Sequence, residues 1–213
     1  MEILTGIGLA SSAGLNAYIP LLAAGLLSRF TDVLSLGPGW QWLENPWALG
    51  ILAVLLVVEF CADKIPALDH VNDVLQTLVR PASGGIVFGA GATATTGEAA
   101  AAAEAGGGVD VWLAVAGAAI ALFFHLLKAL VRLMVNAVSG GVGAPVVSTA
   151  EDATSAVLSV LAVLLPVLVV LFVSAVAVVG VWLVVRLRRR RRRGEAAADG
   201  GGGPHSRRVA GGA

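Results

Sequence analysis

The chain has 213 residues, of which 57% are apolar and only 13% charged, and its mean hydropathy is +0.87. Soluble domains carry roughly 25% charged residues, so this composition argues against a soluble globular protein and favours a polytopic membrane protein. The net charge of zero hides an asymmetry, because acids exceed bases in residues 1–185 and bases exceed acids in residues 186–213. A single cysteine, Cys61, excludes a disulfide within the chain.

The first half of the chain predicts three membrane spans. A spanning helix needs about 20 mostly apolar residues, and residues 6–27 and 47–62 meet or approach this length. The loop between them is rich in tryptophan, which suits the membrane–water interface. Residues 67–80 have apolar side chains at helical spacing and predict a short amphipathic helix that ends before Pro81. Residues 82–97 are rich in Gly, Ala and Thr and predict a third span.

The second half predicts two more spans and a basic tail. Residues 111–135 form the fourth predicted span. The next apolar region is too long for one crossing, so we expect Pro166 to divide it. The division predicts a short helix over residues 152–165 and a fifth span over residues 167–185. Residues 188–213 are charged and Gly-rich and predict a disordered tail.

Arginines determine the predicted orientation. Residues 1–187 are expected to form an all-α transmembrane domain, a polytopic helical membrane protein of about five spans. The arginine run from Arg186 to Arg193 follows the last span directly, and basic residues beside a span stay in the cytoplasm. We therefore expect a multi-pass protein of the cell inner (plasma) membrane with a cytoplasmic C-terminus.

The expected partner of the chain is the lipid bilayer. The arginine run is a stop-transfer signal that can also bind anionic lipid headgroups. A nucleic-acid partner is not expected, because no aromatic side chain is interleaved with this charge. A homo-oligomer is compatible with the sequence.

The sequence also suggests an internal repeat with an offset of 79 residues. Residues 66–73 (PALDHVND) can be laid over residues 145–152 (PVVSTAED), each with Pro first and an acid seven residues later. Residues 10–14 fall opposite residues 89–93 at the same offset. Two copies of a span–span–short-helix unit plus a final span would explain this pattern, and transporters place sites between such repeats. Chance similarity of apolar, low-complexity sequence explains it equally well.

Carboxylates gather where the second span ends. The stretch EFCADKIPALDHVND places Glu59 and Asp63 four residues apart, on one helix face, and adds Lys64, Asp69 and Asp73. A carboxylate below the interface is costly and faces protein or water by default, which makes Glu59 and Asp63 candidates for a polar site. Acids near helix starts also cap free N–H groups, so capping or ordinary solvation in a loop is the alternative for Asp69 and Asp152.

The fourth span carries the opposite charge. His125, Lys128 and Arg132 are spaced i, i+3 and i+7 and so share one helix face. Snorkelling of long side chains to the headgroups explains Arg132 well and His125 poorly, and a structural hydrogen bond is the alternative for His125. We expect these bases to pair with the acids at the end of the second span and with Glu151 and Asp152.

The first span contributes Asn16, Tyr18 and Pro20. Asn16 and Tyr18 in mid-membrane need hydrogen-bond partners, and Pro20 can break the helix and free carbonyls to line a polar path. A kinked packing helix fits these residues equally well. No motif for a cofactor is present in the sequence, and the spacing of its few histidines is too generic to indicate a metal site. Neither a cofactor nor a metal is expected.

Four stretches carry a resemblance to a known family: GLASSAGLNAYIPLL, EFCADKIPALDHVNDVLQTLVRP, HLLKALVR and SGGVGAPVVSTAEDATS. Together they resemble an uncharacterised bacterial integral-membrane family, a domain of unknown function numbered 4126, from about Gly6 to Pro166. The family pattern often has Arg where Asn16 stands, so the chain departs from it there. The resemblance implies a small multi-span membrane protein and carries over no activity.

The leading functional hypothesis is a channel or secondary transporter, not an enzyme, for an ion or a small anionic solute. In it His125 and one carboxylate carry protons, and Lys128 and Arg132 receive an anionic group. The alternative is a non-transporting scaffold or envelope-assembly protein whose salt bridges only fix helix packing, and a weaker one is an intramembrane lipid-modifying enzyme. The candidate path comprises Asn16, Glu59, Asp63, Lys64, Asp69, Asp73, His125, Lys128, Arg132, Glu151 and Asp152.

Overall fold

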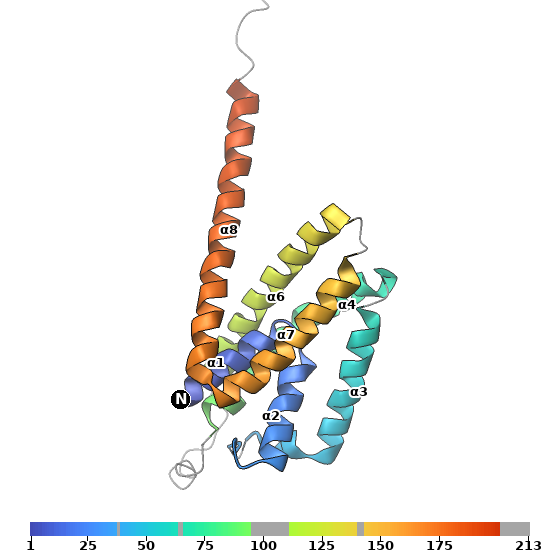
Figure 1. Ribbon diagram of the computed structural model, residues 1–213, viewed down its shortest axis with the longest axis vertical. Coiled ribbons are helices and arrows are strands. Elements are labelled where there is room, and N and C mark those ends of the chain that lie inside the picture. Colours follow the sequence, from blue (N-terminus) through green and yellow to red (C-terminus); the bar gives the residue numbers. More distant parts are fainter. Residues whose placement is uncertain (38, 64–65, 95–110, 140–142, 201–213) are drawn as a thin grey trace, which may run out of the picture. The chain divides into compact units, whose positions relative to one another are not determined.

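Helices form most of the described chain. The computed structural model describes residues 1–37, 39–63, 66–94, 111–139 and 143–200 and has no β-strand in these ranges, which confirms the all-α class. Figure 1 shows the elements: α1 (Glu2–Ala13), α2 (Tyr18–Phe30), the 3₁₀ helix η1 (Gln41–Glu44), α3 (Pro46–Ala62), α4 (Pro66–Ala92), α6 (Val111–Ser139), α7 (Ala144–Leu164) and α8 (Pro166–Gly200).

The chain divides into two units by its contacts. Residues 1–174 hold α1 to α7 with the beginning of α8, and residues 175–213 include the rest of α8. Within the first unit, α1 packs against α2, α4, α6 and α7, while α4 packs along α6 (Figure 1). Helices α2 and α3 pack against each other and against η1. Helix α1 is therefore the central element of the first unit.

Small residues let the central helices approach closely. A Cβ atom added at Gly6 of α1 would lie 2.9 Å from the carbonyl oxygen of Phe88 in α4. Helix α4 meets α6 in the same way, because a Cβ at Gly84 would lie 2.3 Å from Cβ of Ala121, and one at Gly117 would lie 2.4 Å from the Gly84 carbonyl oxygen. Close approach over small residues is the usual basis of helix association in lipid.

The segment expected as the first span, residues 6–27, consists of two helices with a break at residues 14–17. The side-chain oxygen of Asn16 accepts hydrogen bonds of 3.0 and 3.1 Å from two backbone N–H groups in the first turn of α2, and thereby caps that helix. Pro20 lies in this first turn, where its missing N–H removes no helical hydrogen bond. The break therefore lies ahead of the proline and is stabilised by a capping side chain.

The short helix and the third span expected on either side of Pro81 are corrected to one helix. Proline inside a helix removes an N–H donor and clashes with the carbonyl four residues back. Helix α4 nevertheless continues through Pro81 to Ala92. Arg80 and Ser83, on either side of the proline, are both buried against other helices, so tertiary packing outweighs the local penalty.

The other helices keep their expected order but not all of their expected ends. Helices α3 and α6 include the spans expected at residues 47–62 and 111–135. Helix α7 begins at Ala144 rather than at residue 152, because the proline at position 145 suits the first turn of a helix.

Helix α8 extends further than expected. The fifth span was expected over residues 167–185, and residues 188–213 were expected to be disordered. The helix instead continues to Gly200, and residues 201–213 lie outside the described ranges. Arginine and alanine, which fill much of the extension, are strong helix formers.

The suggested repeat agrees with the structure in one feature and differs in another. Helices α4 and α7 both begin at or next to the prolines paired by the 79-residue offset, Pro66 and Pro145. The second prolines behave differently, since Pro81 lies inside α4 whereas Pro166 begins α8. The repeat therefore stays a prediction.

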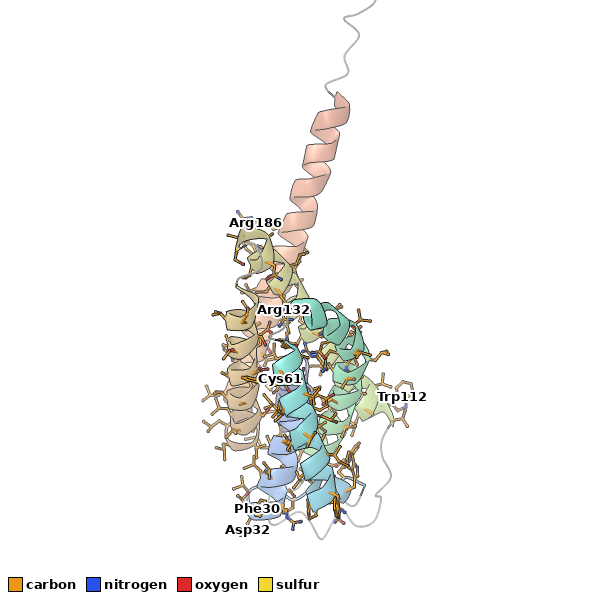
Figure 2. The ribbon with its side chains drawn as sticks, turned by 90° about the vertical axis from the view of Figure 1, so that its right-hand side faces the viewer. Phe30, Asp32, Cys61, Trp112, Arg132 and Arg186 are labelled. Carbon is orange, nitrogen blue, oxygen red and sulfur yellow. The ribbon has the colours of Figure 1, made fainter. Side chains whose placement is uncertain are left out.

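The first unit buries several charged side chains while many large apolar side chains are exposed. Large apolar side chains lie outside, among them Trp47 and Trp112, which are 82% and 80% exposed, and Trp112 projects away from the helices in Figure 2. Charged side chains such as Glu59 and Arg80 are buried. Among the described residues, two helical segments are long and apolar enough to cross a membrane, and three more are apolar but shorter. The long ones are Val111–Ser139 and Pro145–Leu164, and the shorter ones are Tyr18–Phe30, Pro46–Ala62 and Pro166–Trp182.

The close contact between α4 and α6 predicts a specific sensitivity to added volume. Gly84→Ala should lower the free energy of unfolding by about 1–3 kcal/mol, the usual cost of overpacking, because the new methyl group would overlap Ala121. Gly50→Ala is the matched control, since a Cβ at Gly50 meets nothing within 4 Å. Denaturation of both variants in detergent measures the difference, and equal stability of the two would contradict the packing described.

Candidate functional site

Charged side chains meet in the interior of the first unit. Glu59 and Asp63 come from the end of α3, Arg80 from α4, and Lys128 and Arg132 from α6, and each is at most 5% exposed. A buried charge is tolerated only where it is paired and hydrogen-bonded. We use the name buried network for these five residues together with Asn16, His125, Glu151 and Asp152.

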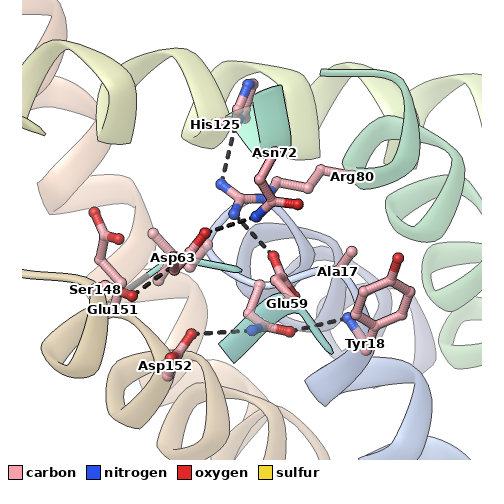
Figure 3. Close-up of polar contacts among 12 residues, drawn as sticks. Ala17, Tyr18, Glu59, Asp63, Asn72, Arg80, His125, Ser148, Glu151 and Asp152 are labelled. Atoms are coloured by element: carbon pink, nitrogen blue, oxygen red, sulfur yellow. Dashed lines mark hydrogen bonds and ion pairs between the residues drawn. The ribbon is translucent and has the colours of Figure 1, made fainter. Parts of the chain in front are cut away.

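Arg80 lies at the centre of one end of the network (Figure 3). Its Nη2 lies 3.0 Å from Oε1 of Glu59, and its Nη1 donates to Nδ1 of His125 at 3.1 Å. Because a guanidinium has no acceptor atom, Nδ1 must accept and carries no proton. His125 is therefore neutral with its hydrogen on Nε2, which faces Oγ1 of Thr77 at 3.2 Å. Arg80 thus joins α3, α4 and α6.

Asp63 collects donors from three helices at the other end of the network. Its Oδ1 accepts a 2.6 Å hydrogen bond from Nδ2 of Asn72, and its Oδ2 accepts one of 3.2 Å from Oγ of Ser148 (Figure 3). Nη2 of Arg132 lies 3.6 Å from the same Oδ2. This contact is the pairing expected between the end of the second span and the basic face of the fourth.

Glu151 of α7 contacts two cations. Its Oε2 lies 2.9 Å from Nζ of Lys128 and 3.4 Å from Nη2 of Arg132. Lys128 also donates a 2.9 Å hydrogen bond to the carbonyl oxygen of Leu15. Leu15 lies in the break between α1 and α2, so the lysine joins α7 to a carbonyl that no regular helix uses.

The helix break supplies further polar contacts. Nδ2 of Asn16 donates a 2.9 Å hydrogen bond to Oδ1 of Asp152, and Oγ of Ser83 donates to the carbonyl oxygen of Ala17. Asn16 therefore caps α2 with its oxygen and binds α7 with its nitrogen. The polar groups freed by the break are satisfied by side chains of neighbouring helices, as irregular backbone in an apolar setting requires.

A serine cluster holds α1 against α7 beside the network. Oγ of Ser12 lies 2.8 Å from Oγ of Ser155 and 2.6 Å from Oγ of Ser159. Oγ of Ser155 donates a 3.1 Å hydrogen bond back to the Ser12 carbonyl oxygen. All three side chains are fully buried, which makes this cluster a packing contact between the two helices.

The structure brings together most of the residues predicted for the site. Three of them cannot be placed: Lys64 lies outside the described residues, and Asp69 and Asp73 lie on α4 while their side chains lie outside the described part. The remaining predicted residues all belong to the buried network. They are Asn16, Glu59, Asp63, His125, Lys128, Arg132, Glu151 and Asp152.

Sequence reasoning missed Arg80, which is the largest fully buried side chain of the described residues. The signal was present, because Gln76, Arg80 and Ser83 are spaced i, i+4 and i+7 and so form one polar stripe along α4. Local rules place a helix end at Pro81, so they divide this stripe between two predicted elements. Neutral partners such as Asn72 and Ser148 carried no comparable signal.

A few buried polar atoms lack a partner within the described part of the chain. Three of them belong to the end of the network around Arg80: Oε2 of Glu59, Oε1 of Gln76 and Nε of Arg80. Oδ2 of Asp152 is a fourth. The described residues contain no group of three or more His, Cys, Asp or Glu that could hold a metal ion.

One comparison with known proteins gives a match. A family model described as "Domain of unknown function (DUF4126)" matches residues 3–186. The chain therefore belongs to this family, which confirms the resemblance to domain of unknown function 4126. No curated protein and no solved structure matches the chain.

The ion pair at Arg80 predicts a large loss of stability on removal of one charge, and recovery on removal of both. Arg80→Gln leaves Glu59 buried without its cation, and loss of one partner of a buried pair costs about 3–5 kcal/mol. The double variant Glu59→Gln with Arg80→Gln removes both charges and should recover most of this loss. Arg29→Gln is the control, because Arg29 is exposed and surface changes stay within about 0.5 kcal/mol. Denaturation in detergent gives all three values, and a double variant no more stable than Arg80→Gln would contradict the pairing.

Proposed function

We propose that this member of the DUF4126 family is an integral membrane protein that moves an ion or a small solute across the bilayer by way of the buried network. The observation that carries the proposal is the burial of carboxylates and bases at a helix break, inside helices whose outer side chains are apolar. Ionisable groups at such depth mark ion and substrate pathways. Broken helices that offer free backbone groups form the sites of many secondary transporters.

The arrangement of the network supports a small, charged cargo. Lys128 and Arg132 both contact Glu151, so an anionic group that replaced this carboxylate would meet two cations. The Leu15 carbonyl oxygen, which Lys128 already contacts, is a further polar group of the break. An anionic solute is therefore the cargo that we propose first.

The proposal includes a plasma-membrane location with the C-terminus in the cytoplasm. Trp182 lies at the end of the apolar part of α8. The guanidinium carbon of Arg186 lies 4.9 Å from the centroid of the Trp182 ring. Tryptophan and arginine side by side suit the boundary between hydrocarbon and headgroups. The arginines that follow would contact anionic headgroups, each contributing about 1 kcal/mol near the surface.

A scaffold that moves no solute is the second candidate. It is favoured by the fact that the cations of the network contact carboxylates of the same chain. Such pairs can fix helix packing without any transport. The two functions differ in what the loss of one charge changes, because a scaffold loses stability alone whereas a transporter loses flux.

Flux through liposomes tests the transport proposal. Wild-type protein should carry a solute from a panel of inorganic and organic anions, and Lys128→Ala should reduce that flux to the level of empty liposomes. Lys128→Ala with Glu151→Gln removes both charges of the pair and keeps the test valid if the single variant fails to fold. Arg29→Ala, an exposed cation, is the control and should leave flux unchanged. Undiminished flux in folded Lys128 variants, or no wild-type flux under any gradient, would refute the proposal.

A further inference from the structure

The charges of the buried network do not balance. Its described side chains include four carboxylates and three basic groups, two from arginine and one from lysine, while His125 is neutral because its Nδ1 accepts from Arg80. With all of these acids and bases ionised, the described network carries one negative charge in excess. Excess charge away from water is costly, and a buried group commonly responds by binding a proton. The four carboxylates are Glu59, Asp63, Glu151 and Asp152.

Hydrogen-bond partners distinguish among these four carboxylates. Both oxygens of Asp63 accept hydrogen bonds, and Glu151 contacts two cations. Glu59 and Asp152 each keep one oxygen without a partner in the described part of the chain. Asp152 is partly exposed as a residue, although its Oδ2 is itself buried, whereas the whole Glu59 side chain is 1% exposed. An unsatisfied acceptor is most costly where water is excluded.

Around Glu59, buried hydrogen-bond acceptors without a described partner outnumber such donors. Gln76 lies one helical turn before Arg80 on α4, and its Oε1 is a second buried acceptor without a described partner. Nε of Arg80 is the one unpartnered donor at this end of the described network. A proton on Glu59 turns an acceptor into a donor and corrects this deficit.

We propose that Glu59 is the proton-binding residue of the network and that the coupling ion of transport is therefore a proton. The proton would come from water and form an O–H bond with Oε2, while Oε1 keeps its contact with Nη2 of Arg80. It would leave Oε2 to water without any change in oxidation state. Its role in transport rests on the proposed function, but proton binding itself does not.

The charged groups around Glu59 favour a proton over a metal cation. Arg80 of α4 and Lys128 of α6 act on Glu59 as positive charges, Tyr18 of α2 lies near it, and Asp63 is the neighbouring carboxylate on α3. A metal ion would add a charge beside the 3.0 Å contact with Arg80 and would need several oxygen ligands. A proton needs one oxygen.

Binding of this proton would change how the helices are held together. Ionised Glu59 attracts the Arg80 guanidinium by charge, whereas neutral Glu59 keeps only a hydrogen bond. The attraction between α3 and α4 is therefore weaker in the protonated state. A ligand-dependent difference of this kind shifts the population of two conformations, which is what coupling to a solute requires.

Infrared difference spectroscopy of the full-length protein in lipid nanodiscs tests the assignment. Acid-minus-alkaline spectra of the wild type should contain the carbonyl stretch of one protonated carboxylic acid, and Glu59→Gln should lack it. Glu59→Asp keeps the charge and should shift the frequency of the band. Asp152→Glu is the matched control and should leave the band in place. A band that moves with Asp152→Glu, or that is unchanged in Glu59→Asp, would overturn the proposal.

Two further measurements keep the test decisive. The double variant Glu59→Gln with Arg80→Gln removes both buried charges and should also lack the band. It therefore provides the same test if the single variant fails to fold. Stabilisation of the wild type by sodium chloride relative to choline chloride, lost in Glu59→Gln, would assign a metal cation in place of the proton.

Flux measurements separate this proposal from the proposed function. Proton binding at Glu59 without flux under any proton or solute gradient would refute transport and leave the proton site standing. Flux that persists in Glu59→Gln with the proton gradient collapsed, together with an absent wild-type band, would refute the proton site and leave transport standing.

Discussion

A buried arginine is the constraint on which the arrangement of the first unit depends. Arg80 is fully removed from solvent, and a guanidinium has only donors, so acceptors must reach it from other helices. Glu59 supplies one from α3 and His125 supplies one from α6. The glycine contacts between α4 and α6 bring the two backbones close enough for the second contact. Packing of small residues and pairing of the charge therefore support each other.

The break between α1 and α2 depends on the same neighbours. A helix interruption leaves carbonyl and N–H groups without helical partners, and in an apolar environment only other protein groups can satisfy them. Lys128 reaches the carbonyl of Leu15, Ser83 reaches that of Ala17, and Asn16 caps the start of α2. Side chains of the break and of the neighbouring helices thus satisfy the backbone groups that the interruption leaves without helical partners.

Much of the site could be predicted because charge and periodicity act over short distances in sequence. The spacing of His125, Lys128 and Arg132 placed them on one helix face, and the cost of buried charge required acids opposite them. Arg80 could not be found in this way, because Pro81 indicates a helix end by local rules and only tertiary contacts override it. For the first span, Pro20 indicated either a break or a kink, and the capping role of Asn16 depends on the backbone that it caps. The roles of Lys64, Asp69 and Asp73 stay predictions.

The two ends of the network differ in a way that bears on function. Asp63 and Glu151 each gather several donors, although Oδ2 of Asp152, next to Glu151 in the chain, lacks a partner in the described part. The end at Glu59 and Arg80 has one ion pair and several buried atoms without a described partner. Apolar residues of similar size in place of a buried ion pair are often as stable or more so. A charged pair beside several buried atoms without a described partner therefore fits a site that changes state.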